Sequence, residues 1–212
     1  MSRINLGGSL GHMIDFEEIP EDAIIIDGGV CQGEFIDELN SRLDISNFTI
    51  IGFEPSTTNI DFVKNKFKNF ENIHLEDKAI VGKSFPDTIN FYEYRGAGLE
   101  EWGNVMGLYQ DSAKNRNATQ VEYAVETITI EKIFDLYNIT HIDYLKMDIE
   151  GTEFNLVETL TQETANKINQ LSMEVHEDPE DAKKSKEALM NNLIKLGFEV
   201  HFERGELYGC RV

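Results

Sequence analysis

Short apolar, β-branched runs alternate with segments of helical period along this chain of 212 residues, and this alternation constrains the fold most strongly. The pattern is typical of β-α-β units, in which helices cover both faces of a mostly parallel sheet. The run 24–26 is isoleucine at every position, as expected for a strand that is buried on both faces. We therefore predict an α/β fold with a doubly wound, mostly parallel sheet.

The expected elements follow from these runs. Strands are expected at 23–27, 49–54, 73–75, 88–92, 125–129, 141–147, 170–175, 199–203 and 206–211. Helices are expected at 34–43, 57–69, 130–137, 152–160 and 179–196. The last two strands turn at Arg204 and Gly205, which predicts a C-terminal antiparallel hairpin at one edge of the sheet.

The length fits a single domain over residues 1–212, with one irregular segment. Residues 94–118 contain the only tryptophan, Trp102, and have no clean period. Long connections in compact domains are usually functional, so we expect a substrate-side insertion here. Tyr94, Trp102 and Tyr109 are suited to stack against a sugar or a planar ring, or else to pack the segment down.

The charge balance limits the partners. Lys and Arg number 19 against 39 Asp and Glu, a formal net charge of −20. Such a surface repels phosphate backbones and anionic lipid, so we expect neither nucleic acid nor a membrane as partner. The first twenty residues lack the apolar segment of a signal peptide, and the only cysteines are Cys31 and Cys210. We expect a reduced, cytoplasmic protein, whose oligomeric state the sequence leaves open.

Carboxylates follow several of the predicted strands. Asp27 and Glu54 end the first two, Asp148 and Glu150 follow the strand at 141–147, and the strand at 170–175 runs into His176. In open α/β sheets, ligands bind outside the carboxyl ends of the strands, where the strand order reverses. These side chains are therefore expected to line one site.

The first strand ends in a glycine turn formed by Gly28, Gly29 and Gly33. A dinucleotide fingerprint requires a glycine where this chain has Val30, and Asp27 directly ahead would repel a pyrophosphate. A nicotinamide-dependent oxidoreductase is therefore disfavoured. Asp27 suits a ligand with an ammonium beside a sulfonium, as in S-adenosylmethionine.

Two further carboxylates complete the expected cofactor site. Glu54 is placed to accept both ribose hydroxyls, and Asp77 lies where a polar side chain can meet the adenine amine. The competing interpretation is that Asp27 and Glu54 serve only as helix caps or dipole partners, and that Asp77 only shapes a turn.

Three stretches of this sequence resemble the FkbM-type methyltransferases, a branch of the class I, Rossmann-like enzymes that use S-adenosylmethionine. They are Ile-Asp-Gly-Gly-Val-Cys-Gln-Gly at 26–33, Gly-Phe-Glu-Pro at 52–55, and Ile-Asp-Tyr-Leu-Lys-Met-Asp-Ile-Glu-Gly-Thr-Glu at 142–153. The resemblance extends from about residue 24 to 175. The resemblance implies methylation of a hydroxyl oxygen on a sugar or small natural product. The expected acceptor is therefore a glycan or another small molecule.

The candidate catalytic bases are Asp148, Glu150 and His176. Lys146 shares a strand face with residues 148 and 150 if the strand continues, so it is expected to pair with one of these carboxylates and lower its pKa. His176 has an unperturbed pKa near 6.5 and can accept a proton at neutral pH. A divalent cation held by Asp148, Glu150 and His176 is an alternative that we leave open but do not expect.

The glycine turn also carries a departure from the family pattern. Val30 and Cys31 stand where the family commonly has alanine and asparagine. This departure keeps open a second hypothesis, a catalytically inactive Rossmann-like module that binds a ligand or a partner.

Overall fold

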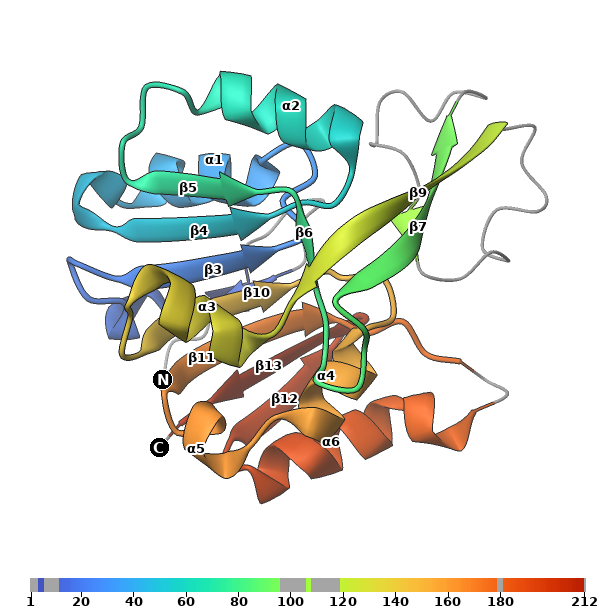
Figure 1. The fold of residues 1–212 in the computed structure, drawn as a ribbon. Helices are drawn as coiled ribbons and strands as arrows, with labels where there is room; N and C mark the ends of the chain where they lie inside the picture. The colour runs from blue at the N-terminus through green and yellow to red at the C-terminus, as the bar shows by residue number, and fades with distance from the viewer. Residues whose placement is uncertain (1–3, 6–11, 96–105, 108–118, 179–180, 212) are drawn as a thin grey trace.

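The computed structural model describes residues 4–5, 12–95, 106–107, 119–178 and 181–211, and its centre is a seven-stranded sheet (Figure 1). In spatial order the strands are β12 (Glu199–Glu203), β13 (Glu206–Cys210), β11 (Ile168–Glu174), β10 (Ile142–Met147), β3 (Ile24–Gly28), β4 (Thr49–Phe53) and β5 (Ile73–Glu76). The five strands from β11 to β5 are parallel, and β13 and β12 form the predicted antiparallel hairpin. The predicted fold class is confirmed.

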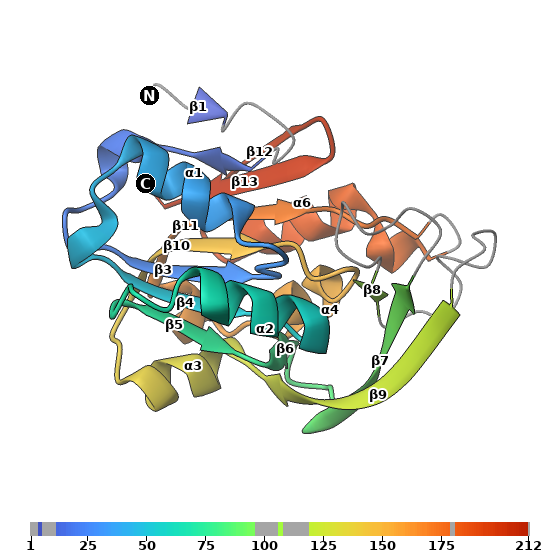
Figure 2. The same cartoon turned by 90° about the horizontal axis from the view of Figure 1, so that it is seen from above.

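Helices cover both faces of this sheet (Figures 1 and 2). The first two helices share a core with one face of the sheet, and the last four share a core with the other. They are α1 (Glu34–Arg42), α2 (Thr57–Lys66), α3 (Ile130–Tyr137), α4 (Glu153–Thr159), α5 (Gln162–Ala165) and α6 (Lys186–Lys195). Short 3₁₀ turns lie at Phe16–Glu18, Ile45–Asn47 and Ala182–Lys184.

The isoleucine run of β3 shows why the sheet needs both layers. Ile25 packs with Ile50 in the core beneath α1 and α2, whereas Ile26 packs with Ile51 in the core beneath α3, α4 and α6. All four side chains have no solvent exposure. Because side chains alternate along a strand, an apolar residue at each position is stable only between two helical layers.

The two strands predicted at 88–92 and 125–129 form but lie outside the main sheet. They belong to a second sheet of the order β6-β9-β7-β8, which extends away from the carboxyl ends of the parallel strands (Figure 1). Its strands are β6 (Lys78–Ile80), β7 (Thr88–Arg95), β8 (Met106–Gly107) and β9 (Thr119–Ile128). β7 thus extends to Arg95 within the irregular segment, and β9 begins directly after that segment at Thr119. Residues 96–105 and 108–118, with Trp102 and Tyr109, lie outside the described residues.

Other boundaries differ from the predicted ones for local reasons. The helix expected at 179–196 is a 3₁₀ turn followed by α6, because the Ser185 side chain caps a new start by accepting from the Ala188 N–H. The helix expected at 57–69 ends at Lys66. The antiparallel pair of β1 (Ile4–Asn5) and β2 (Met13–Ile14), together with β6 and α5, was not expected from the sequence.

The strand order reverses between β3 and β10. From β3 the chain adds β4 and β5 on one side, and later adds β10 and β11 on the other. The crevice outside the carboxyl ends of β3 and β10 is therefore the point at which an open α/β sheet binds ligands.

We expect Gly29→Ala to lower the free energy of unfolding by more than about 4 kcal/mol, among the largest effects of single substitutions. Gly29 has φ of +78°, and an added Cβ would lie 2.0 Å from the backbone oxygen of Asp148. The matched control is Gly205→Ala, because Gly205 has φ of +90° but no atom within 4 Å of an added Cβ. That control should lose only about 1–2 kcal/mol, the cost of the left-handed conformation. Equal losses in urea denaturation would contradict the close approach of Gly29 to Asp148.

Candidate active site

Asp27 is the penultimate residue of β3, and its side chain at the crevice has no solvent exposure. The ammonium of Lys146, on the neighbouring strand β10, lies 3.1 Å from its Oδ1. Its Oδ2 is buried and has no hydrogen-bond partner among the described residues. Burial raises the pKa of the Asp27 carboxyl, and the Lys146 ammonium acts against that rise. The site thus contains a buried carboxylate oxygen that is available to a cationic partner.

The partner of Lys146 differs from the predicted one. Lys146 was expected to pair with Asp148 or Glu150, but β10 ends at Met147, so the strand face does not continue to those residues. Lys146 instead lies opposite Asp27 in the parallel register of β10 and β3. Its ammonium also donates to the carbonyl oxygens of Gly28 at 3.2 Å and Gly29 at 2.5 Å. One lysine therefore holds both the buried carboxylate and the glycine turn.

Glu54 follows β4 directly and is 1% exposed. Its Oε2 accepts the backbone N–H of Cys31 at 2.7 Å, and its Oε1 accepts that of Ser56 at 2.8 Å. Burial raises the pKa of Glu54 to about 7, although both hydrogen bonds act to lower it. Each oxygen of an ionised carboxylate has two acceptor sites, so Glu54 can accept further donors.

The glycines of the turn are each required by a close contact. An added Cβ would lie 2.5 Å from the Phe67 ring at Gly33 and 3.1 Å from Ile80 at Gly28. Gly29 also donates its N–H to the carbonyl of Phe53 at 2.9 Å, which ties the turn to the end of β4. Packing alone therefore accounts for Gly28, Gly29 and Gly33, and it brings the turn against the segment after β10.

Asp77 lies exposed between β5 and β6. The preceding residue, Glu76, accepts the Tyr137 hydroxyl at 2.8 Å and pairs with Lys78 at 3.5 Å. Glu76 is thus already bonded to a residue of α3 and to a residue of the second sheet. Asp77 stays a predicted contact to adenine.

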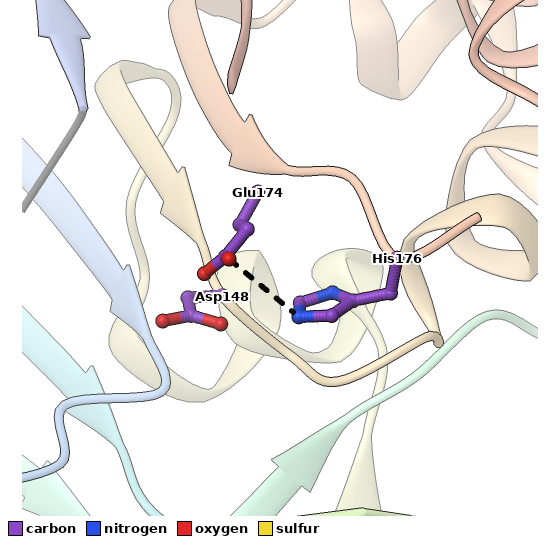
Figure 3. A group of neighbouring side chains, drawn as sticks. All are labelled: Asp148, Glu174 and His176. Carbon is purple, nitrogen blue, oxygen red and sulfur yellow. Dashed lines mark ion pairs between the residues drawn. The ribbon is translucent and has the colours of Figure 1, made fainter. Parts of the chain in front are cut away.

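A second group of side chains gathers at the ends of β10 and β11. Asp148, Glu174 and His176 converge, with one ligand atom from each lying within 4.8 Å of the others (Figure 3). The structure thus brings together two of the predicted residues and adds Glu174. Glu150, the third predicted residue, has φ of +53° and places Oε2 3.7 Å from Nε2 of His176. Burial, together with Asp148 and other neighbouring acids, raises the pKa of Glu150 to about 7.

His176 is held in place by Glu153, the first residue of α4. Glu153 has no solvent exposure, and its Oε1 lies 2.5 Å from Nδ1 of His176. Burial lowers the pKa of His176, but Glu153, Glu150 and Glu174 outweigh burial and raise it to about 9. The imidazole is therefore protonated at neutral pH, unlike a histidine with the unperturbed pKa near 6.5.

Two residues of this group were not selected from the sequence, and only one of them carries a sequence signal. Glu174 lies near the end of the strand predicted at 170–175 and is the last residue of β11, at the same sheet edge as Asp148. Glu153 closes the Leu-Lys-Met-Asp-Ile-Glu-Gly-Thr-Glu stretch, where its burial behind His176 has no counterpart in spacing or composition. Glu174 could be found from the residues that end the predicted strands, whereas the role of Glu153 is visible only in the folded structure.

The comparisons with known proteins agree with this architecture. The model of the methyltransferase FkbM domain matches residues 3–200, so the chain belongs to the FkbM methyltransferase family. A crystal structure of methyltransferase FkbM from Methylobacillus flagellatus superimposes with a TM-score of 0.54 and 14% identity, covering 89% of this chain and 44% of that one. This chain therefore spans less than half the length of that protein. No curated protein matches the chain significantly.

A further similar structure is fibrillarin from Aeropyrum pernix, crystallised with natively bound S-adenosyl-L-methionine. It has a TM-score of 0.49 and 12% identity, covering 92% of this chain and 69% of that one. That score lies below 0.5, so only the first similarity bears on the fold. Within the described residues, no helix has the length and apolar character needed to span a bilayer.

We expect Lys146→Met to lower the free energy of unfolding by about 3–5 kcal/mol, because it leaves Asp27 buried without a compensating charge. Replacing Asp27 by Asn in the same chain should recover a large part of that loss. Urea denaturation of the two single variants and the double variant measures the coupling. Lys132→Met is the control, since the pair of Lys132 with Asp87 is exposed and should change little. Additive single losses would contradict a direct Asp27–Lys146 interaction.

Proposed function

We propose that this protein is an S-adenosylmethionine-dependent methyltransferase that methylates a hydroxyl oxygen on a sugar or small natural product. The observation that carries the proposal is the buried Asp27 carboxylate, whose Oδ2 has no hydrogen-bond partner in the described structure. A buried carboxylate oxygen without a hydrogen-bond partner is costly, which favours a cationic ligand at Oδ2 in addition to Lys146 at Oδ1. Family membership supports methyl transfer as the reaction.

The residues around the crevice fit S-adenosylmethionine. Asp27 would hold the amino-acid ammonium, the backbone of the turn with Gly28, Gly29 and Gly33 would approach the methionine part, and Glu54 would accept the ribose hydroxyls. The adenine amine is assigned to Asp77, which is exposed beyond β5. When bound, S-adenosylmethionine supplies a methyl group that the sulfonium has already activated.

The remaining task of the protein is to orient the acceptor and to remove its proton. Asp148, Glu150 and His176 are the candidate groups, and they lie beside the glycine turn through the contact of Gly29 with Asp148. A hydroxyl gives up its proton reluctantly. With its pKa raised to about 9, His176 is already protonated at neutral pH, so the carboxylate of Asp148 or Glu150 is the group placed to accept that proton. Oxygen is therefore the favoured acceptor atom.

The second sheet supports an acceptor site at residues 94–118 within a single domain. The Tyr123 hydroxyl of β9 accepts the N–H of Thr57 at 3.2 Å and donates to Glu93 of β7 at 2.8 Å. These two hydrogen bonds hold β7 and β9 of the second sheet next to the start of α2, which follows shortly after Glu54 in the chain. The net charge of −20 favours a neutral or cationic small acceptor over a polyanion. Cys31 and Cys210 form no disulfide in the described structure, which is compatible with the cytoplasmic location we propose.

We expect S-adenosylmethionine, but not NAD, to raise the melting temperature of the purified chain. At about 100 times its Kd, the ligand should add about 2.7 kcal/mol to the free energy of unfolding. Asp27→Asn should remove this shift, because the amide cannot pair with the ammonium. Asp87→Asn, at an exposed ion pair, is the matched control and should keep it.

The outcomes separate the competing hypotheses. A shift with NAD alone would identify a nicotinamide enzyme, and an unchanged shift in Asp27→Asn would contradict the assignment of the donor site. A panel of glycans and small hydroxylated compounds incubated with methyl-labelled donor then tests turnover. Donor binding without transfer to any compound would favour the catalytically inactive module.

Donor binding should depend on the ionisation of Glu54. The pKa of Glu54 is raised to about 7 in the free protein, and ribose hydroxyls donate to its ionised form, so binding lowers this pKa and releases a proton. Affinity should therefore increase about tenfold between pH 5.5 and 7.0. Calorimetry in buffers of different ionisation enthalpy measures both effects. Glu54→Gln should lose most of the pH dependence, and an affinity that is flat in the unmodified protein would contradict the role of Glu54.

A further inference from the structure

Asp148, Glu174 and His176 form a compact group of potential metal ligands at the ends of two neighbouring parallel strands. Asp148 follows β10, Glu174 ends β11, and His176 lies two residues beyond it. One atom from each side chain lies within 4.8 Å of the others, and Figure 3 shows the three pointing toward a common centre. Two carboxylate oxygens and one imidazole nitrogen are a ligand set that Mn²⁺ and Mg²⁺ accept.

The second observation is the contact between Glu153 and the imidazole of His176. Glu153 is fully buried at the start of α4 and lies 2.5 Å from Nδ1 of His176, while its Oε2 has no hydrogen-bond partner among the described residues. This contact turns Nε2 toward the carboxylates, 4.0 Å from Glu174. A histidine that binds a metal almost always donates its other ring N–H to a carboxylate or carbonyl in this way.

The negative charge of the carboxylates around His176 also favours a bound cation. Asp148, Glu150, Glu153 and Glu174 lie around one basic side chain, His176. His176 forms ion pairs with the last three of these acids, and no other basic side chain of the described residues does so. Lys146, which lies near the end of β10, forms its ion pair with Asp27 instead. Four carboxylates around one imidazole leave an excess of negative charge in a partly buried site, which a divalent cation would compensate.

We propose that Asp148, Glu174 and His176 bind a divalent cation of the Mn²⁺ or Mg²⁺ class. Glu153 orients His176 through its contact with Nδ1 and does not itself bind the cation. The ligand set differs from the alternative left open by the sequence, because Glu174 takes the place of Glu150. Its role rests on the proposed function: when bound, the cation would hold the acceptor hydroxyl oxygen and lower the pKa of that hydroxyl, and Glu150, which is not one of the ligands, would accept the proton. The cation thereby places the acceptor oxygen beside Asp148 and the glycine turn.

The test uses the metal-free full chain, without donor or acceptor, titrated with MnCl₂ and followed by calorimetry and by loss of the EPR signal of free Mn²⁺. We expect one saturable site per chain. Glu174→Gln and His176→Ala should each weaken Mn²⁺ binding at least tenfold, and Glu153→Gln should weaken it by about 10–100-fold. His201→Ala is the matched control, because His201 lies on the edge strand β12, where it pairs with Glu203 at 3.7 Å. This variant should bind Mn²⁺ like the unmodified chain.

Circular dichroism of each variant ensures that folded proteins are compared. Absence of saturable binding up to millimolar Mn²⁺, or equal weakening in His201→Ala, would overturn the site and indicate only nonspecific attraction to the acidic surface. The S-adenosylmethionine melting shift is measured on the same metal-free protein. Donor binding without Mn²⁺ binding would reject the metal site alone, and Mn²⁺ binding without donor binding would reject the proposed function alone.

Discussion

The ion pair between Asp27 and Lys146 is the interaction on which the rest of the structure depends. It joins the two central strands, β3 and β10, at the point where the strand order reverses. Lys146 also donates to the carbonyls of the glycine turn, so the same ammonium that compensates the buried carboxylate sets the position of the loop. Because both charges are buried, neither can be removed alone without leaving the other uncompensated. The determinants of the fold and of the proposed donor site are therefore the same side chains.

The crevice has two halves to which we assign different roles in the proposed reaction. Asp27 and Glu54 form the half suited to a cationic cosubstrate, and the group around His176 forms the half suited to the acceptor. The halves meet where Gly29 packs against the backbone of Asp148, a contact that permits no side chain. A methyl donor and an acceptor oxygen must approach closely for transfer, and this packing would bring the two proposed halves of the site together.

Much of this architecture could be predicted from the sequence because local pattern determines it. The isoleucine run of β3, the glycine turn and the carboxylate at each strand end depend on alternation and on chain direction, which are local properties. The second sheet could not be predicted, because β7 and β9 pair across an irregular segment and no local signal fixes such a register. The same limit explains the misassigned partner of Lys146, which depends on the register of two distant strands, and the role of Glu153, which depends on how α4 packs behind His176.

The most direct test of the account is a crystal structure of the full chain with S-adenosylmethionine bound. The account predicts that the amino-acid ammonium lies within about 3 Å of Oδ2 of Asp27, at ordinary hydrogen-bond distance, with the ribose hydroxyls on Glu54. A ligand bound elsewhere, with Asp27 contacting only Lys146 and Glu54 contacting only the backbone of Cys31 and Ser56, would contradict it.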